Sequence, residues 1–175
     1  DLRRQRQMCI RDSPHIDIAV KNNVSKWQKE LDAELMPNNV LRLSESGLIS
    51  DKKGYDTGEW WVQDYSSQLP VKCLNIGQND EILDLCAAPG GKTAQMLALG
   101  AKVHSIDLSD KRIIRFKENM RRLKFNPVID NADILTYKSE KKWQKILLDV
   151  PCSSTGTIRK NPDILYSKNE KSVSN

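Results

Sequence analysis

The chain has 175 residues, enough for one domain of ordinary size or for one domain and part of another. Hydrophobic residues make up 38% and charged residues 29% of the sequence, which is typical of a globular protein and unlike a disordered or fibrous chain. No run approaches the roughly 18 apolar residues of a membrane-spanning helix, so we expect a protein without membrane contacts.

The cysteines exclude a disulfide scaffold and a zinc site. Cys9, Cys73, Cys86 and Cys152 are far apart and form neither a CxxC pair nor, with the two histidines, a zinc-ligand pattern. We therefore expect reduced thiols, no bound metal and a cytoplasmic protein, and we expect a monomer.

The amino-acid sequence of the first residues indicates that they do not come from the natural gene. Residues 3–13, RRQRQMCIRDS, can be encoded by the DNA of a transposase-type adapter used in sequencing libraries. The alternative is a natural basic leader or an RNA-binding arm, because the segment holds four arginines and lacks the apolar core of a signal peptide. We expect residues 1–13 to be an artefact. Without their four arginines and two aspartates the net charge falls from +5 to +3, and the natural protein is expected to be longer at both ends.

A small module is predicted next. Residues 15–21 (HIDIAVK) alternate apolar and polar positions and predict a half-buried strand. Ser25 is the expected N-cap of a helix over 26–36 that ends at Pro37. The apolar face of this helix would hold Trp27, Leu31 and Leu35.

Turn-forming residues dominate the following stretch, 38–58. It contains two short strand candidates, LRL at 41–43 and GLI at 47–49. We therefore expect residues 14–57 to be the end of an α+β module with its connector, and we place the boundary of the next domain at residue 58.

Beyond residue 58, apolar runs alternate with amphipathic helical patterns. Strand candidates lie at 81–86, 101–107, 127–133 and 145–150. Helical spacing follows the first strand, in GGKTAQMLALG. The nearly continuous apolar run of the fourth strand predicts that it is covered on both faces. This order predicts a parallel α/β sheet.

The helix after the second strand has the strongest pattern. Ser109 is its expected N-cap, and Pro127 marks the exit from the segment. Its apolar stripe would consist of Ile113, Phe116, Met120 and Leu123, at steps of three and four residues. We expect this stripe to pack against the sheet.

Candidate site residues follow the strands, because open parallel sheets bind ligands beyond their carboxyl ends. The first candidate is the glycine turn after Asp84, which lets the backbone approach a ligand and presents the free N–H groups of a helix start. Asp107 ends the second strand, where nucleotide-binding sheets hold ribose hydroxyls. Asp133 ends the third strand and suits contact with an adenine amino group. Both aspartates could instead be ordinary turn residues in solvent.

The fourth strand leads into Asp149-Val-Pro-Cys-Ser-Ser-Thr-Gly156. Pro151 fixes the chain where it leaves the sheet, which would hold Cys152 over the ligand crevice. A buried filler is the alternative for this cysteine. We favour a reactive or positioning role.

Two rival interpretations concern phosphate and nucleic acid. Gly91-Lys92-Thr93 resembles the tail of a phosphate-binding P-loop, but that motif requires glycine where this chain has Cys86. Seven basic residues crowd the third predicted helix and its end, and they could form a nucleic-acid surface or only a solvated face. They are Lys111, Arg112, Arg115, Lys117, Arg121, Arg122 and Lys124.

Taken together, the motifs resemble the RsmB/Sun/NOL1-NOP2 family of RNA cytosine-5 methyltransferases, especially its bacterial 16S ribosomal RNA branch. LDLCAAPGGKT, the two aspartates and DVPCSSTG occur in the family's order, and the lead-in GEWWVQDYSSQLP and the later GTIRKNPDI are also similar. The resemblance covers about residues 14–175. It implies a Rossmann-like, S-adenosylmethionine-dependent sheet, truncated after its fourth strand in this chain.

The resemblance also assigns roles. A cofactor pocket would be lined by Cys86, Ala87, Ala88, Pro89, Gly90, Gly91 and Lys92. Asp107 would hold the ribose of S-adenosylmethionine, Asp133 would approach its adenine, and Asp149 would lie at the reacting end. Residues 14–57 would belong to an RNA-binding module, and residues 58–175 to the N-terminal part of the catalytic domain.

Family members carry their nucleophilic cysteine in a TCS-like motif after a further strand, and no cysteine follows Cys152 here. That thiolate adds to cytosine C6, which makes C5 nucleophilic; a base then removes the C5 proton and the thiolate leaves. The resemblance gives Cys152 a part in product release. DNA cytosine-5 enzymes attack with a PC cysteine, but their glycine motif is of the F-x-G-x-G kind.

We therefore expect a fragment of an enzyme that methylates C5 of a cytosine in ribosomal RNA, most closely the 16S molecule, and a fragment that is inactive alone. The alternative is a non-catalytic RNA-binding or ribosome-assembly protein that keeps the cofactor pocket. A nucleophilic cysteine in the complete gene would separate the two.

Overall fold

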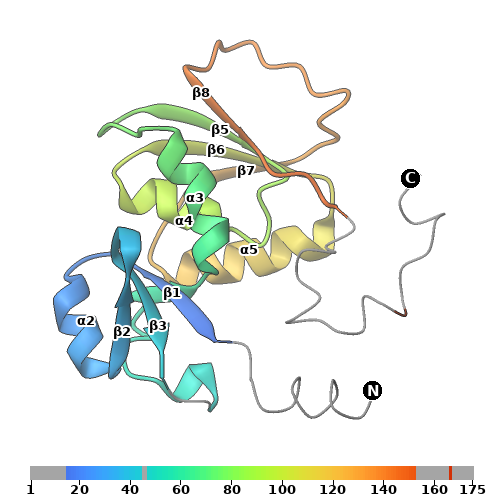
Figure 1. Cartoon of the computed structure of the whole chain (residues 1–175). Coiled ribbons are helices and arrows are strands. Elements are labelled where there is room, and N and C mark those ends of the chain that lie inside the picture. Colours follow the sequence, from blue (N-terminus) through green and yellow to red (C-terminus); the bar gives the residue numbers. More distant parts are fainter. Residues whose placement is uncertain (1–14, 45–46, 153–165, 167–175) are drawn as a thin grey trace. The chain divides into compact units, whose positions relative to one another are not determined.

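The computed structural model describes residues 15–44, 47–152 and 166 (Figure 1). Its contacts divide the chain into two compact units, Ile16–Asp149 and a unit that combines residues 1–15 with 150–175. Most of the latter, including the adapter-like segment 3–13, lies outside the described residues. The fold below is that of Ile16–Asp149.

An antiparallel sheet of four strands comes first. It consists of β1 (Ile16–Val20), β2 (Ala33–Met36), β3 (Val40–Leu43) and β4 (Trp60–Val62), in the order β2-β3-β1-β4. The register pairs Ile18 with Leu41 on one side and with Val62 on the other. As predicted from the alternation in 15–21, β1 buries its middle residues, and Ile18 joins Trp27 and Trp60 in one apolar cluster.

The helix after β1 is shorter than predicted. It is α2 (Val24–Glu30), and its N-cap is Asn23, whose side chain accepts from the backbone N–H of Lys26, so the predictions of Ser25 as cap and of a helix to residue 36 were wrong. Asp32 adopts a left-handed conformation that turns the chain, and the following residues pair with β3. Leu35 is consequently 48% exposed. The backbone N–H and C=O groups of Ala33–Met36 are satisfied by pairing with β3, although the helical spacing of the apolar residues predicted a continuous helix.

Several short elements complete this region. Two 3-10 turns, η1 (Pro37–Asn39) and η2 (Ile49–Asp51), flank β3 and precede β4. The strand predicted at 41–43 is confirmed within β3, whereas the one predicted at 47–49 was wrong, since η2 begins there. Helix α3 (Tyr65–Cys73) was not predicted from the sequence.

A parallel sheet follows, as predicted. Its strands are β5 (Glu81–Leu85), β6 (Lys102–Asp107), β7 (Val128–Asn131) and β8 (Lys145–Leu148), in the order β7-β6-β5-β8. All neighbouring pairs run parallel. This crossover order is that of a Rossmann-like sheet, and it brings the carboxyl ends of β5, β6 and β8 to one edge.

Two helices connect the first three of these strands. Helix α4 (Gly91–Ala98) follows β5, and α5 (Asp110–Arg122) follows β6. The Ser109 hydroxyl accepts from the backbone N–H of Arg112, which confirms the predicted cap. The predicted stripe of Ile113, Phe116, Met120 and Leu123 is buried throughout.

Strand β8 is less covered than its sequence suggests. Leu147 is buried, but Ile146 and Leu148 are 51% and 55% exposed, so the prediction of cover on both faces was wrong for the described part of the chain. No helix forms in residues 132–144, between β7 and β8, and β8 is an edge strand of the described sheet. One face of β8 therefore has no packing partner among the described residues.

The two sheets pack through a shared core. Ala19 and Trp61 of the first sheet join Phe116 and Met120 of α5 in one apolar cluster. At Gly58 the chain passes so close to α5 that an added Cβ would lie 1.9 Å from the carbonyl oxygen of Arg122. Strand β4 lies beyond residue 58 yet belongs to the first sheet, and the division into an RNA-binding module and a catalytic domain stays a prediction.

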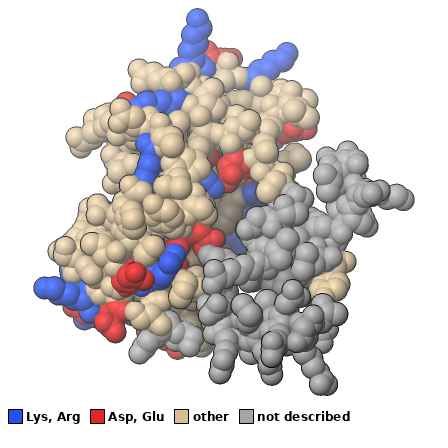
Figure 2. All heavy atoms as spheres, viewed as in Figure 1, with Lys and Arg blue, Asp and Glu red and all other residues tan. Residues whose placement is uncertain are grey.

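The described surface carries mixed charge. In Figure 2, Lys and Arg side chains are interspersed with Asp and Glu over the face that is seen. Among the described helices, none has the length and apolar character needed to cross a bilayer.

Candidate functional site

The glycine turn predicted as a ligand loop connects β5 to α4. Cys86 has a left-handed conformation, with φ of 62°, and Gly90 has φ of 101°. A Cβ at Gly90 would lie 2.7 Å from the Met120 methyl carbon and 2.9 Å from the Phe116 ring. Position 90 therefore requires glycine both for its backbone conformation and for the close approach of α5.

Asp107, at the end of β6, holds this loop. It is 1% exposed, and its carboxylate accepts from the backbone N–H groups of Ala88 and Ser109, each at 3.0 Å. The Arg112 guanidinium lies 3.4 Å from the same carboxylate and also donates to the Ala88 carbonyl oxygen. The structure thus shows Asp107 as an anchor of the loop, and its role toward a ribose stays a prediction.

Sequence reasoning missed Arg112 as a contact of this loop. It treated the residue as one of seven basic side chains on a helix face. The available signal was its position in the first turn of α5, directly after the strand that carries Asp107. A cation placed there can reach back to the strand end.

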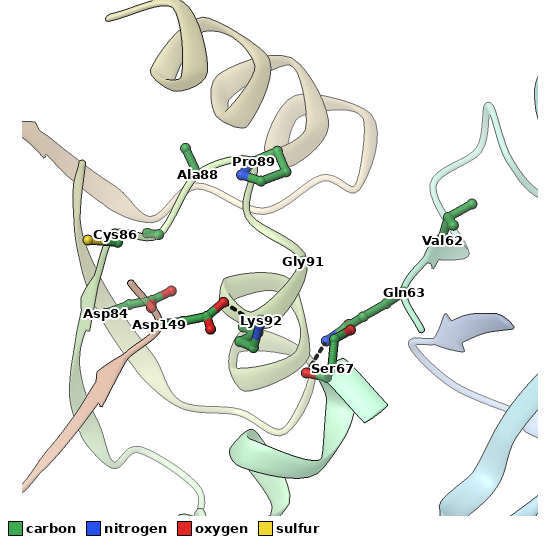
Figure 3. A pocket seen from close by; sticks show the side chains of 11 residues that line it. Val62, Gln63, Ser67, Asp84, Cys86, Ala88, Pro89, Gly91, Lys92 and Asp149 are labelled. Carbon is green, nitrogen blue, oxygen red and sulfur yellow. Dashed lines mark hydrogen bonds and ion pairs between the residues drawn. The ribbon is translucent and has the colours of Figure 1, made fainter. Parts of the chain in front are cut away.

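A cavity of about 200 Å³ lies beside the loop (Figure 3). Its lining combines the loop and α4 with β4, α3 and the segment after β8. The lining residues are Val62, Gln63, Ser67, Asp84, Cys86, Ala87, Ala88, Pro89, Gly91, Lys92 and Asp149. Most of the predicted cofactor-binding residues are therefore brought to one hollow.

Lys92 and Asp149 meet in this cavity, although 57 residues separate them in the sequence. The Lys92 ammonium lies 2.5 Å from a carboxylate oxygen of Asp149, as Figure 3 shows. The Lys92 side chain is 17% exposed and that of Asp149 is 57% exposed. A fixed cation and a carboxylate open to solvent thus lie together beside the glycine turn.

Asp84 is a second carboxylate of the cavity, and it is 1% exposed. Burial raises its pKa to about 7, and the neighbouring charges of Asp149 and Asp107 act in the same direction. The Thr93 hydroxyl, 2.5 Å away, and the charge of Lys92 offset part of this rise in pKa. Asp84 therefore changes its charge near neutral pH, which the sequence pattern did not reveal.

Cys86 lines the cavity as a neutral thiol. Burial raises the pKa of this thiol, and the negative charge of Asp107 raises it further. A thiol with a raised pKa holds little thiolate at neutral pH. The residue fits a wall of the pocket and is unsuited to nucleophilic attack.

A buried glutamine network supports the cavity from the other side. Gln63 accepts from the Trp61 indole N–H at 2.7 Å and donates to the Gln95 side-chain oxygen at 3.0 Å. Gln95 donates in turn to the carbonyl oxygen of Gln68 at 3.0 Å. The network ties the lead-in segment to α4. Sequence reasoning noted the lead-in as a motif but assigned no role to these residues.

Four predicted residues do not line this cavity: Gly90 and Asp107, which shape the loop beside it, and Asp133 and Cys152. Asp133 lies two residues past β7 and accepts from the backbone N–H of Leu135 at 2.9 Å, in a local turn. Cys152 is exposed and belongs to the unit outside Ile16–Asp149. The rest of its motif, 153–156, lies outside the described residues, and the roles of Asp133 and Cys152 stay predictions.

A metal centre has no candidate in the described part of the chain. No group of three or more His, Cys, Asp or Glu side chains there is arranged to hold an ion.

Comparison with known proteins identifies the family. The sequence pattern of 16S rRNA methyltransferase RsmB/F matches residues 71–175. Ribosomal RNA small subunit methyltransferase B of Yersinia enterocolitica is 36% identical over 154 residues, which cover 83% of this chain and 36% of that protein. The chain thus spans about a third of the length of the curated relatives that it matches.

Solved structures agree with the family assignment. The crystal structure of PH0851 has a TM-score of 0.82 at 26% identity and covers 95% of this chain and 42% of its own. NSun6 from Pyrococcus horikoshii, solved with SFG, has a TM-score of 0.62 at 29% identity and covers 74% of this chain and 34% of its own. The methyltransferase family match and the neighbour solved with SFG support S-adenosylmethionine as the cofactor, as the sequence predicts. The resemblance inferred from the motifs is confirmed, and the chain belongs to the 16S rRNA methyltransferase RsmB/F family.

Proposed function

We propose that the chain is part of an S-adenosylmethionine-dependent enzyme that methylates C5 of a cytosine in 16S ribosomal RNA. The observation that carries this proposal is the cavity in which the glycine turn, Lys92 and Asp149 come together. Family membership supports the reaction class. Within the proposal, residues 14–57 end an RNA-binding module and residues 58–175 begin the catalytic domain.

The cavity fits the amino-acid end of the cofactor. That end carries a carboxylate and an ammonium group, and the cavity offers Lys92 and the first N–H groups of α4 for the former and Asp84 and Asp149 for the latter. Its volume of about 200 Å³ is below the range of about 300–1,000 Å³ for ligand pockets. The remainder of a nucleoside-bearing cofactor would extend beyond it, toward Asp107 and Asp133.

When bound, S-adenosylmethionine supplies an electrophilic methyl group on its sulfonium centre. Lys92 orients Asp149 at the open side of the cavity, where a carboxylate stabilises positive charge. Asp107 keeps the loop in place through Ala88, and Gly90 lets α5 close against it. Together these residues fix the position of the cofactor relative to the open face.

The reacting cysteines complete the proposal. By the resemblance, the thiolate that attacks cytosine C6 belongs to a residue beyond Cys152, and Cys152 assists release of the product. The stretch Asp1–Asn175 would then bind the cofactor without transferring its methyl group. Cys86 does not replace the missing thiolate, because burial raises the pKa of its thiol.

Calorimetric titration of the 175-residue chain with S-adenosylmethionine tests the cofactor site. We expect binding, and we expect Asp107→Ala to weaken it by more than about tenfold, whether through lost hydroxyl contacts or through release of the loop. Unchanged affinity in this variant would contradict any role of Asp107 at the site.

Methyl transfer tests the reaction. A protein extended to the end of the natural gene should incorporate tritiated methyl groups into C5 of cytosine in 16S ribosomal RNA, and the 175-residue chain should not. In the extended protein, Cys152→Ala should accumulate a covalent RNA adduct on a denaturing gel, provided that the downstream cysteine is present. An extended protein that binds RNA but transfers no methyl group would instead be the assembly factor considered above.

A further inference from the structure

The basic residues of α5 fall into two groups in the structure. Arg112 contacts Asp107, and Arg122 donates to the carbonyl oxygens of Tyr55 and Trp60 at 2.7 and 3.1 Å, so these two arginines serve the fold. The other five are exposed, and none pairs with a carboxylate in the described part of the chain. They are Lys111, Arg115, Lys117, Arg121 and Lys124.

Two of the exposed cations form one stripe. Lys117 and Arg121 are four residues apart within α5, which places them on the same side of the helix. Both residues belong to the C-terminal half of α5, which leads into the connection to β7. Unpaired cations in a row attract a polyanion more strongly than the same charges paired with carboxylates.

A cavity of about 340 Å³ lies along this stripe. Its lining includes Lys117, Arg121, Phe125, Asn126, Pro127 and Ile129. The ammonium group of Lys21 lies over the Phe125 ring, 4.5 Å from its centroid, and donates to the Leu123 carbonyl oxygen, so Lys21 holds this ring in place and does not line the cavity. Cations and an aromatic ring in one hollow are the combination that holds both the phosphates and the bases of a single strand.

This cavity is separate from the cofactor pocket. The two share no lining residue. In this cavity, the phosphates of a nucleotide chain would contact Lys117 and Arg121. A base of the same chain would then meet the Phe125 ring and the amide of Asn126. A double helix hides its base faces, whereas a single strand exposes them for contact with a ring.

We propose that the cavity between α5 and β7 binds a single-stranded segment of RNA, with phosphates on Lys117 and Arg121 and a base against Phe125. The inference rests on the proposed function, since it takes RNA as the substrate, and it locates a contact outside the reacting centre. It also resolves the two interpretations of the basic helix. Part of the helix serves the fold, and part forms a nucleic-acid surface.

The test measures binding of a fluorescein-labelled single-stranded RNA of about 12 nucleotides to the 175-residue chain, by anisotropy at several salt concentrations. Replacing both Lys117 and Arg121 by alanine should weaken binding about 25-fold at 0.1 M salt and reduce the salt slope by about 1.4, because each single-strand phosphate contact contributes about 0.7. The matched control is the double replacement of Lys111 and Arg115 by alanine. It removes the same charge from the same helix, away from the cavity.

Phe125→Leu tests the base contact separately. It should weaken RNA binding about fivefold or more with an unchanged salt slope, since it removes a stacking surface and no charge. Thermal unfolding and titration with S-adenosylmethionine are measured for every variant. Unchanged cofactor affinity shows that a loss of RNA binding comes from the proposed surface and not from a failed fold.

Three results would overturn the inference. Equal effects of the two double replacements would show general electrostatic attraction without a site. An unchanged affinity in Phe125→Leu would remove the base contact, and equal affinity for duplex RNA of the same sequence would remove the single-strand preference. If the chain binds no RNA yet binds S-adenosylmethionine, the surface is refuted while the cofactor site stands. If it binds RNA but no cofactor, the proposed function fails instead.

Discussion

Each of the two sheets contains a buried carboxylate, and their surroundings differ. Asp17 in β1 is 3% exposed, and Arg42 contacts both of its oxygens, at 2.8 and 3.2 Å. Asp17 also accepts from the backbone N–H of Tyr65 at 3.0 Å. Asp84 in β5 is 1% exposed, and the hydrogen bond shown to its side chain comes from the neutral Thr93 hydroxyl.

This difference separates a buried charge that is compensated from one that is not. A buried carboxylate that has a guanidinium and a backbone donor is compensated, and it fixes the geometry of the first sheet. A buried carboxylate with one neutral donor is not compensated, which is why the pKa of Asp84 rises to about 7. Perturbed groups of this kind cluster at functional sites, and Asp84 lines the cavity beside the glycine turn.

The two sheets share one apolar core, and Gly58→Ala should disrupt the packing between them. The new Cβ would lie 1.9 Å from the Arg122 carbonyl oxygen, at a residue with φ of +73°. We expect the free energy of unfolding to fall by about 4 kcal/mol, measured by urea denaturation. Gly47→Ala is the control, because Gly47 also has a positive φ but no atom within 4 Å of the added carbon. Equal losses would mean that backbone strain, and not contact with α5, decides the cost.

Arg42→Met should expose the dependence of the first sheet on its ion pair. It leaves the carboxylate of Asp17 buried without its guanidinium, and we expect the free energy of unfolding to fall by about 3 kcal/mol. The control is Lys53→Met, since the Lys53 ammonium lies 2.5 Å from Glu30 but is largely exposed. That variant should leave the urea midpoint unchanged. A similar midpoint for both variants would show that the Asp17 pair does not support the sheet.

Lys92→Met should affect function in the second sheet more than stability. It removes the cation that contacts Asp149, and affinity for S-adenosylmethionine should fall by more than about tenfold, measured by calorimetry. Lys145→Met is the matched control, because Lys145 pairs with Asp80 at 2.6 Å near the opposite end of β8. Its cofactor affinity should match that of the unaltered chain. Reduced affinity in both variants would point to a disturbed sheet and not to a lost contact.

Asp84→Asn should change how the stability of the chain depends on pH. The folded chain keeps the proton on Asp84 up to about pH 7, whereas the unfolded chain loses it near pH 4. Stability should therefore fall as pH rises between these values, by up to about 1.4 kcal/mol per pH unit from this group, and then level off.

The variant should lose this slope and gain stability at pH 8 relative to the unaltered chain, measured by urea denaturation across that range. Asp51→Asn, at an exposed carboxylate, controls for the general effect of removing one negative charge. An unchanged pH profile in Asp84→Asn would show that Asp84 is ionised in the fold at neutral pH.

The sequence predicted the second sheet better than the first. The apolar runs of β5 and β6 and the stripe of α5 are local patterns, and their side chains are buried as predicted. The run of β8 predicted a strand but not the exposure of Ile146 and Leu148. In the first region, residues 31–36 carry helical spacing that β3 overrides by pairing with Ala33–Met36. Strand β4 and α3 were missed, because three residues of strand and a helix with Pro70 inside it give weak local signals.

For the site, the sequence pattern pointed to the glycine turn, Lys92 and the aspartates at the strand ends as candidate residues. Tertiary structure alone decided that Lys92 meets Asp149 and that Asp107 anchors Ala88. It also decided that Asp84 has no directly bound cation among its described contacts, which raises its pKa. The reason is physical: a motif specifies the groups and the local backbone, whereas the charge state and contacts of a group depend on burial and on neighbours that are distant in the chain.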